Sequence, residues 1–257
     1  MPSISVKNLN KTYSGTHEVE ALSDVNLEIK DGEFVCILGP SGCGKSTLLE
    51  ILAGLQNPTS GEILVGDMEV KGPSRDIGVV FQDSSLFPWR TVQENIEFGL
   101  ELQGIKRADR RKKAEGYIQM VNLNGFENRY PHQLSGGMRQ RAGLARTLIG
   151  QPKVLLMDEP FGAVDYLTRL QLQNDVTEIW QKEKKTVVFI THDVTESVFL
   201  ADRVVVFSPR PGKIRKIFEI PQARPRENND LALLDIQERI YRVLNSNDPA
   251  SELEYTI

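Results

Sequence analysis

The sequence predicts an α/β fold with a mostly parallel central sheet, an N-terminal antiparallel β subdomain and an inserted helical subdomain. Short, uninterrupted apolar runs at 154–157 and 186–191 are typical of parallel strands buried on both faces. Residues 3–34 instead alternate apolar and polar side chains, as antiparallel strands with one solvated face do. From residue 84 to about residue 150 the strand signals stop and helical spacing dominates, which indicates an insertion.

The other elements follow in order along the 257 residues. The main domain is expected to span 3–225, with the helical insertion at about 84–150. Residues 226–257 are expected to form a helical appendage with a frayed end, and the sequence does not indicate its role. The first helix is expected to place Leu48, Ile51, Leu52 and Leu55 on one face. Further strands are expected at 33–38, 62–70, 77–81, 204–207 and 213–220, and helices at 47–55, 92–102, 108–121, 137–149, 166–184 and 231–244.

The stretch between the first buried strand and the first helix has the pattern of a phosphate-binding loop. Glycines let such a loop curl around an anion, and the following helix N-terminus directs partial positive charge at it. Lys45 adds a full charge for the β and γ phosphates, and Ser46 offers a hydroxyl to Mg²⁺. An ordinary glycine-rich turn would not need the complete strand–loop–helix pattern. The loop reads Gly39-Pro40-Ser41-Gly42-Cys43-Gly44-Lys45-Ser46.

Polar residues stand at the ends of several apolar strands. Because ligands of an open parallel sheet bind beyond the carboxyl ends of its strands, we expect these residues to converge. Asp158 has the position of a Mg²⁺ ligand, and Glu159 can polarise an attacking water as a general base. His192 could hydrogen-bond a γ-phosphate, although a lone histidine is more often structural. The residues at predicted strand ends are Gly39, Gln82, Asp158, Glu159 and His192.

A second glycine-containing stretch precedes the helix at 137–149. It reads Leu134-Ser135-Gly136-Gly137-Met138-Arg139-Gln140-Arg141. Ser135 is a favourable N-cap, and the two glycines that follow leave the helix start uncovered, as an anion site requires. Taken alone, this stretch would be read as an ordinary capped helix.

Aromatic residues at two places in the chain have two possible interpretations each. Tyr13, which precedes a Ser-Gly-Thr turn, either packs at a strand end or stacks on a base. Phe87 and Trp89, in the proline-containing run at 86–89, are either buried or part of an exposed docking surface.

Composition restricts the class of protein. The net charge of −4 argues against a general nucleic-acid binder, and the basic run at 106–113 is interpreted as a solvated helix face. The cysteines Cys36 and Cys43 do not make a disulfide framework, so a reducing cytoplasm is expected. The N-terminus does not resemble a signal peptide, and no apolar run approaches the roughly 20 residues that span a bilayer.

With both loops in view, the chain resembles the ATP-binding subunit of ATP-binding cassette (ABC) transporters over residues 3–225. Residues 39–46 match the Walker A motif, 154–159 the Walker B motif and 134–141 the family signature. In the D-loop region, 161–165, Val164 stands where Leu is commoner. The resemblance implies a P-loop ATPase core, with ATP and Mg²⁺ bound between two head-to-tail copies.

The resemblance also assigns site residues. It implies catalytic roles for Glu159, His192 and the Q-loop residue Gln82, and magnesium ligation by Ser46, Gln82 and Asp158. The ATP-binding residues that it implies are Tyr13, Gly39, Pro40, Ser41, Gly42, Cys43, Gly44, Lys45, Ser46 and Thr47, completed by Ser135, Gly136 and Gly137 of the partner copy.

A narrower resemblance is to the nitrate, sulfonate and taurine importer group. It rests on the segments 86–92, 130–133 and 160–163. It implies that Phe87 and Trp89 contact a membrane permease at the cytoplasmic face of the membrane, with a solute-binding protein acting indirectly. The cargo is not legible from this subunit.

Two other classes of function compete with transport. A soluble cassette ATPase that acts on ribosomes or DNA usually carries two cassettes or a long coiled-coil insertion, and this chain shows neither. A phosphate-loop kinase would have no use for the stretch around Ser135, and Glu159 favours water as the nucleophile. Nucleic acid is therefore not an expected partner.

Overall fold

The computed structural model describes residues 2–15, 17–162 and 164–246, so Ala163 of the D-loop region and the predicted frayed end lie outside them. Its centre is a six-stranded sheet in the order β10-β9-β3-β8-β7-β6, in which only β10 is antiparallel to its neighbour. These strands are β3 (Phe34–Leu38), β6 (Ile77–Val80), β7 (Val154–Asp158), β8 (Thr186–Thr191), β9 (Arg203–Phe207) and β10 (Ile214–Glu219).

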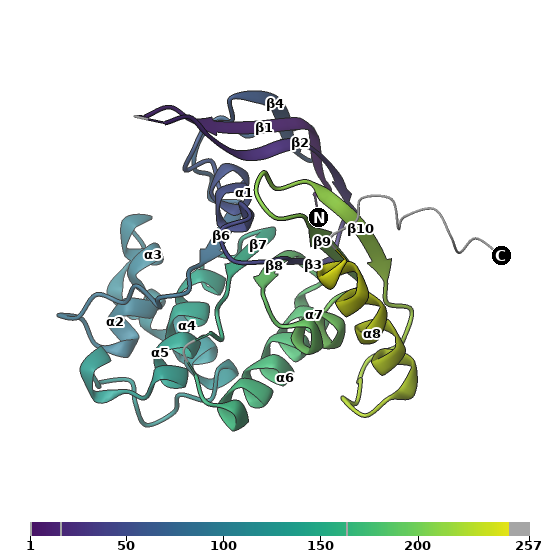
Figure 1. Cartoon of the computed structure of the whole chain (residues 1–257). Helices are drawn as coiled ribbons and strands as arrows, with labels where there is room; N and C mark the ends of the chain where they lie inside the picture. Colours follow the sequence, from purple (N-terminus) through teal and green to yellow (C-terminus); the bar gives the residue numbers. More distant parts are fainter. Residues whose placement is uncertain (1, 16, 163, 247–257) are drawn as a thin grey trace.

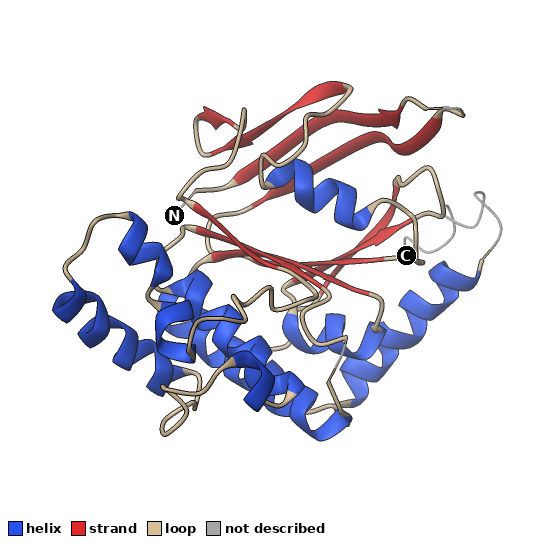
Figure 2. Cartoon of the chain, turned by 90° about the vertical axis from the view of Figure 1, so that its left-hand side faces the viewer, coloured by secondary structure: helices blue, strands red, loops and turns tan. Residues whose placement is uncertain are grey.

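A second, antiparallel sheet has the order β2-β1-β4-β5. Its strands are β1 (Ile4–Tyr13), β2 (Val19–Ile29), β4 (Ser60–Val65) and β5 (Met68–Glu69). Figure 2 shows this sheet stacked over the first one, with a single helix between them and the other helices on the opposite face. The mixed architecture expected from the sequence is confirmed.

The helix between the sheets is α1 (Lys45–Leu52) (Figure 1). Its buried residues Leu48 and Ile51 belong to a core that also contains Ile37 of β3 and Leu9 of β1. On the other face, Cys36 and the remaining helices form the larger core. Because neighbouring strand residues point to opposite faces, both faces of β3 are covered, which explains its continuous apolar sequence.

The other helices follow one another over the lower face of the sheet in Figure 1. Four of them come between β6 and β7, and the last packs against α7 and β10. They are α2 (Val92–Ile96), α3 (Phe98–Leu102), α4 (Arg107–Met120), α5 (Gly136–Leu148), α6 (Tyr166–Glu183), α7 (Val194–Leu200) and α8 (Leu231–Asn245), with a 3₁₀ turn η1 (Pro131–Gln133) before α5. Within the described residues, no helix has both the length and the apolar character needed to cross a bilayer.

The segment that leads into the C-terminal helix is anchored by a buried arginine, Arg226. The Arg226 guanidinium donates hydrogen bonds to the carbonyls of Val198 (3.0 Å), Ala201 (2.6 Å) and Ile220 (3.1 Å). Burial, together with the charge of the neighbouring Arg224, lowers the pKa of Arg226 to about 10, while the carbonyls satisfy its donors. Leu233 and Ile240 of α8 belong to the larger core, so this helix is packed rather than hanging free.

Three predictions of local structure are wrong in detail. The expected strand at 62–70 is the hairpin β4–β5, since Gly66 turns the chain with a φ of 61° and Val65 pairs with Met68. The expected helix at 92–102 is divided into α2 and α3 at Glu97, whose buried carboxylate faces Arg110 at 3.5 Å. Leu55 does not share the buried face of α1, because the helix ends at Leu52 and Leu55 is 50% exposed.

Candidate nucleotide-binding site

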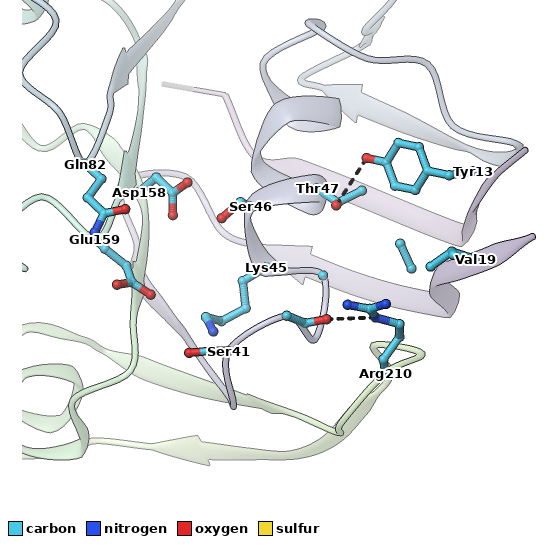
Figure 3. A pocket seen from close by; sticks show the side chains of 13 residues that line it. Tyr13, Val19, Ser41, Lys45, Ser46, Thr47, Gln82, Asp158, Glu159 and Arg210 are labelled. Carbon is cyan, nitrogen blue, oxygen red and sulfur yellow. Dashed lines mark hydrogen bonds between the residues drawn. The ribbon is translucent and has the colours of Figure 1, made fainter. Parts of the chain in front are cut away.

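A cavity of about 540 Å³ opens where α1 meets the carboxyl ends of β6 and β7. Figure 3 shows its walls: the phosphate loop along one side, the carboxylates Asp158 and Glu159 at one end and Tyr13 at the other. The residues that line it are Tyr13, Val19, Ala21, Ser41, Gly42, Gly44, Lys45, Ser46, Thr47, Gln82, Asp158, Glu159 and Arg210.

The phosphate loop adopts a conformation that requires glycine. Gly42 and Gly44 have φ values of 75° and 103°, and a Cβ on Gly44 would lie 2.6 Å from the Ala21 carbonyl oxygen. Lys45 begins α1, and its buried ammonium donates to the carbonyls of Gly39 (2.8 Å) and Pro40 (3.1 Å). The loop therefore holds a full cation beside the exposed N-terminus of a helix, which is the arrangement that binds phosphates.

Some predicted loop residues do not line the cavity. Gly39 and Pro40 contact Lys45 through their carbonyls and hold its side chain. Cys43 points into the core with 1% of its surface exposed, and burial raises the pKa of its thiol. The Cys43 side chain is thus a packing residue rather than part of the cavity wall.

The two carboxylates at the end of β7 point in different directions. Asp158 lies near Ser46, the first residue after the loop lysine, and the Ser46 hydroxyl counteracts part of the rise that burial causes in the pKa of Asp158. Glu159 has a φ of 42° and its Oε2 lies 3.0 Å from Nδ1 of His192. His192 follows β8, is mostly exposed, and does not itself line the cavity. The parallel pairing of β7 with β8 brings these two side chains together.

The residues at this end fit a magnesium ion that is held together with a nucleotide. The described residues contain no cluster of three histidine, cysteine or carboxylate ligands. Mg²⁺ in phosphate-transferring sites needs only one or two protein ligands, because phosphate and water oxygens supply the rest. The Asp158 carboxylate and the Ser46 hydroxyl, which both line the cavity, are suitable oxygen ligands.

Asp158→Asn is expected to raise the unfolding temperature of the ligand-free protein near neutral pH. Burial raises the pKa of Asp158, and the Glu159 charge adds to this rise, so its ionisation destabilises the fold. That cost is absent below the ordinary aspartate pKa and is complete above the raised pKa. The advantage of the variant should therefore disappear as the pH falls through this interval.

Thermal unfolding without nucleotide or Mg²⁺ measures this effect, with Asp67→Asn, an exposed carboxylate in the β4–β5 turn, as the control. A less stable Asp158→Asn protein at neutral pH would show that the contact with Ser46 outweighs the cost of burial.

Gln82 is tied to the helix that carries the second glycine stretch. It follows β6 and lines the cavity, while its backbone carbonyl accepts a hydrogen bond from the Gln140 side chain of α5. Arg146 of the same helix donates to the carbonyls of Ser84 (2.9 Å) and Ser85 (2.7 Å). A shift of α5 would therefore be transmitted to Gln82.

Tyr13 lies at the far end of the cavity from the carboxylates (Figure 3). It ends β1 and is 37% exposed, and its hydroxyl donates to Gln56 (2.9 Å) and lies 3.3 Å from the Thr47 hydroxyl. Held at its edge, the ring leaves a face available to a base. Of the two interpretations of Tyr13, its place in the cavity wall favours stacking on a base over packing at a strand end.

The Ser135-Gly136-Gly137 stretch does not line this cavity. Ser135 caps α5 by accepting a hydrogen bond from the Met138 amide (3.3 Å), as the sequence predicts. A Cβ on Gly137 would approach the Thr168 side chain to 2.3 Å, so glycine is required there for close packing on α6. Within one chain, the phosphate loop and the Ser135-Gly136-Gly137 stretch therefore do not line the same cavity.

Sequence reasoning missed three residues of the cavity. Val19 and Ala21 lie on β2, and Arg210 lies in the loop between β9 and β10. The alternation of 19–29 identifies a strand but not which of its residues faces a loop formed later in the chain. No local signal distinguishes Arg210 from other surface arginines.

This fold and this cavity define a P-loop nucleotide-binding protein. The comparisons narrow the class: a family model described as ABC transporter matches residues 22–162. The chain belongs to the ABC transporter family, as its ATP-binding type of subunit. The resemblance to the ATP-binding subunits of ABC transporters is confirmed.

Several curated proteins are similar over most of their length. An uncharacterized ABC transporter ATP-binding protein of Methanocaldococcus jannaschii is 52% identical, over 94% of this chain and 91% of that protein. The nitrate import ATP-binding protein NrtD of Synechocystis is 50% identical over 83% and 80%, respectively. The aliphatic sulfonates import ATP-binding protein SsuB of Bacillus cereus is 42% identical over 92% and 94%.

Among solved structures, the ATP-binding cassette MJ0796, dimeric and bound to ADP and Pi after hydrolysis, superposes with a TM-score of 0.77. It is 35% identical, and the match covers 86% of this chain and all of that one.

Proposed function

We propose that this chain is the ATP-hydrolysing subunit of an ABC importer, which couples ATP binding and hydrolysis to the uptake of a small solute. Nitrate, sulfonates, taurine or related compounds are the proposed cargo class, in line with the names of the NrtD and SsuB relatives. The subunit acts at the cytoplasmic face of the membrane, bound to permease subunits, and a solute-binding protein contributes indirectly. Residues 3–225 form its ATP-binding domain, with the helical part at about 84–150, and 226–257 are an appendage.

One observation carries this proposal: the cavity is lined by the phosphate-binding part of the loop, including Lys45 and Ser46, and by both carboxylates, but not by the Ser135-Gly136-Gly137 stretch. The exposed Ser135 caps the start of α5 elsewhere on the same chain. A second copy placed head to tail would bring that helix start to the open side of the cavity. The dimeric state of the MJ0796 cassette supports this arrangement.

The chemistry follows from the positions of the side chains. Lys45 and the loop amides bind the phosphate chain, and Tyr13 stacks on the base. Glu159 accepts the proton of the attacking water, and His192, 3.0 Å from it, orients that carboxylate. Gln82, whose side chain lies beside Glu159 in the cavity (Figure 3), positions the water. When bound by Asp158 and Ser46, Mg²⁺ neutralises charge on the phosphate oxygens.

The segment after Gln82 has the form of a permease contact. Trp89 is 70% exposed, whereas Phe87 is partly buried and packs edge-on against Phe98 with ring centroids 4.7 Å apart. Burial therefore does not explain Trp89, and the docking interpretation is retained for it. Exposed tryptophans next to a rigid aromatic support are typical interface anchors.

The loop that carries Trp89 is held in place by hydrogen bonds and an ion pair. The fully buried Asn95 accepts a hydrogen bond from the Phe87 amide (2.8 Å) and donates to the carbonyls of Arg90 and Thr91 (3.0 Å each). Arg90 also pairs with Glu101 at 2.8 Å. A preformed loop loses less conformational freedom on docking, which favours binding by a small surface.

Trp89→Ala is expected to leave the ATPase activity of the isolated subunit unchanged and to weaken its assembly with the permease about tenfold or more. The ring lies outside the nucleotide cavity, so only the permease contact is lost. Co-purification from detergent-solubilised membranes, with Tyr241→Ala on α8 as the control at another exposed aromatic residue, measures the effect. Intact assembly of the Trp89→Ala variant would remove this residue from the interface.

Reconstitution tests the function as a whole. The chain is combined in lipid vesicles with permease subunits that co-purify with it, and ATP-dependent uptake of labelled nitrate, sulfonate and taurine is followed. Uptake that requires ATP supports the proposal. A chain that sediments with ribosomes or DNA and fails to join any permease would support the soluble cassette class instead.

A further inference from the structure

The loop between β9 and β10 is hydrogen-bonded to β2 and packs closely against the phosphate loop, although these segments are far apart in sequence. Gly212 donates its amide to the Ala21 carbonyl (2.9 Å), and its own carbonyl accepts from the Ser23 amide (3.1 Å). A Cβ on Gly212 would lie 2.2 Å from the Cys43 carbonyl oxygen, so only glycine allows this approach. The 208–213 loop therefore forms part of the cavity wall.

The same loop is closed by its own hydrogen bonds. The Ser208 hydroxyl donates to the Pro211 carbonyl (2.9 Å) and accepts from the Lys213 amide (3.0 Å). The Ser208 amide donates to the Lys213 carbonyl (2.9 Å). The side chain of Arg210, at the tip, is thus presented from a fixed backbone.

Arg210 faces the phosphate loop, and only the Nε of its guanidinium donates a hydrogen bond among the described residues. Its Nε donates to the Gly42 carbonyl (3.1 Å), and in Figure 3 its terminal nitrogens extend along the cavity wall towards Val19. No carboxylate in the described part of the chain forms an ion pair with it. An unpaired cation that lines a phosphate-binding cavity has an anion as its natural partner.

We propose that Arg210 is a further nucleotide-binding residue, whose terminal amino groups contact the phosphate chain while Nε fixes Gly42. The inference rests on the proposed ATP site. It assigns Arg210 to the part of the phosphate chain nearer the base, since Arg210 stands on the Val19 side of the loop, away from Lys45 and Glu159. ADP and ATP should therefore both depend on it.

The test separates a phosphate contact from a brace on the loop. Arg210→Gln keeps a side-chain amide for the Gly42 carbonyl and removes the charge. We expect its dissociation constants for ATP and ADP, measured by titration calorimetry without turnover, to rise about tenfold. The affinity should also depend less on salt than in the wild-type protein, while the unfolding temperature without nucleotide is unchanged.

Lys213→Gln is the matched control, because it removes the same charge from the same exposed loop at a residue that does not line the cavity. Wild-type affinity in Arg210→Gln would overturn the proposal. So would a loss of affinity with undiminished salt dependence and a lowered unfolding temperature, since it would identify a brace alone. Failure of the ATP site itself has a different result: the wild-type protein would not bind ATP.

Discussion

Glu159→Gln is expected to bind ATP with near wild-type affinity and to hydrolyse it about 10²–10⁴-fold more slowly, the usual contribution of a general base. The amide keeps the size of the carboxylate and its contact with His192, 3.0 Å away, but cannot accept a proton from water. Phosphate release measures hydrolysis, and calorimetry measures binding. Because ATP then persists between two copies, a dimer should elute on gel filtration with ATP and disappear with ADP.

The control for Glu159→Gln is Glu178→Gln, on the exposed face of α6, which should hydrolyse ATP at the wild-type rate. Near-normal turnover of the Glu159→Gln protein would exclude Glu159 as the base. A slow enzyme that stays monomeric with ATP would keep the base but contradict a nucleotide shared between two copies.

Lys45→Ala is expected to weaken ATP binding by about 10- to 100-fold, which corresponds to the loss of one charge-assisted hydrogen bond in a largely buried site. Lys45 is 6% exposed and is held by the carbonyls of Gly39 and Pro40, so its ammonium is already in place before the nucleotide arrives. No other lysine lines the cavity within the described residues. Titration with ATP and ADP gives the two affinities.

Lys71→Ala removes an exposed lysine far from the cavity lining and should bind as the wild type does. Circular dichroism and thermal unfolding of Lys45→Ala, and of the longer Lys45→Gln, show whether the fold is retained. A folded Lys45→Ala protein with unchanged ATP affinity would contradict the phosphate-loop assignment.

Much of the fold and of the site follows from local sequence. The buried strands around Ile37 and Val188 are continuous apolar runs, and these are read correctly because both faces of the sheet are covered. The loop around Lys45 is equally legible, since its glycines and its helix start are needed in a fixed order. Asp158 and Glu159 could be placed at a strand end for the same reason.

Other features could not be read in this way. Cys43 stands inside the loop sequence but turns into the core, and Trp89 stands in an apolar run but faces outward. Neither direction is encoded by neighbouring residues, because each depends on which distant element packs alongside. The β4–β5 hairpin, in contrast, does have a local signal, because a glycine-containing pair, Gly66-Asp67, is typical of a two-residue turn.

The sequence by itself determined the class of this protein: a mostly parallel sheet, a phosphate-binding loop and carboxylates at the strand ends. Those features are local, since a loop, a cap or a buried strand is specified by a few consecutive residues. Only the tertiary structure decided that Arg210 lies against Gly42, that Glu159 meets His192, and that the Ser135 helix start lies outside the cavity of its own chain. These relations join segments many residues apart, and they are fixed by the order in which strands pair and by the packing of helices against the sheet.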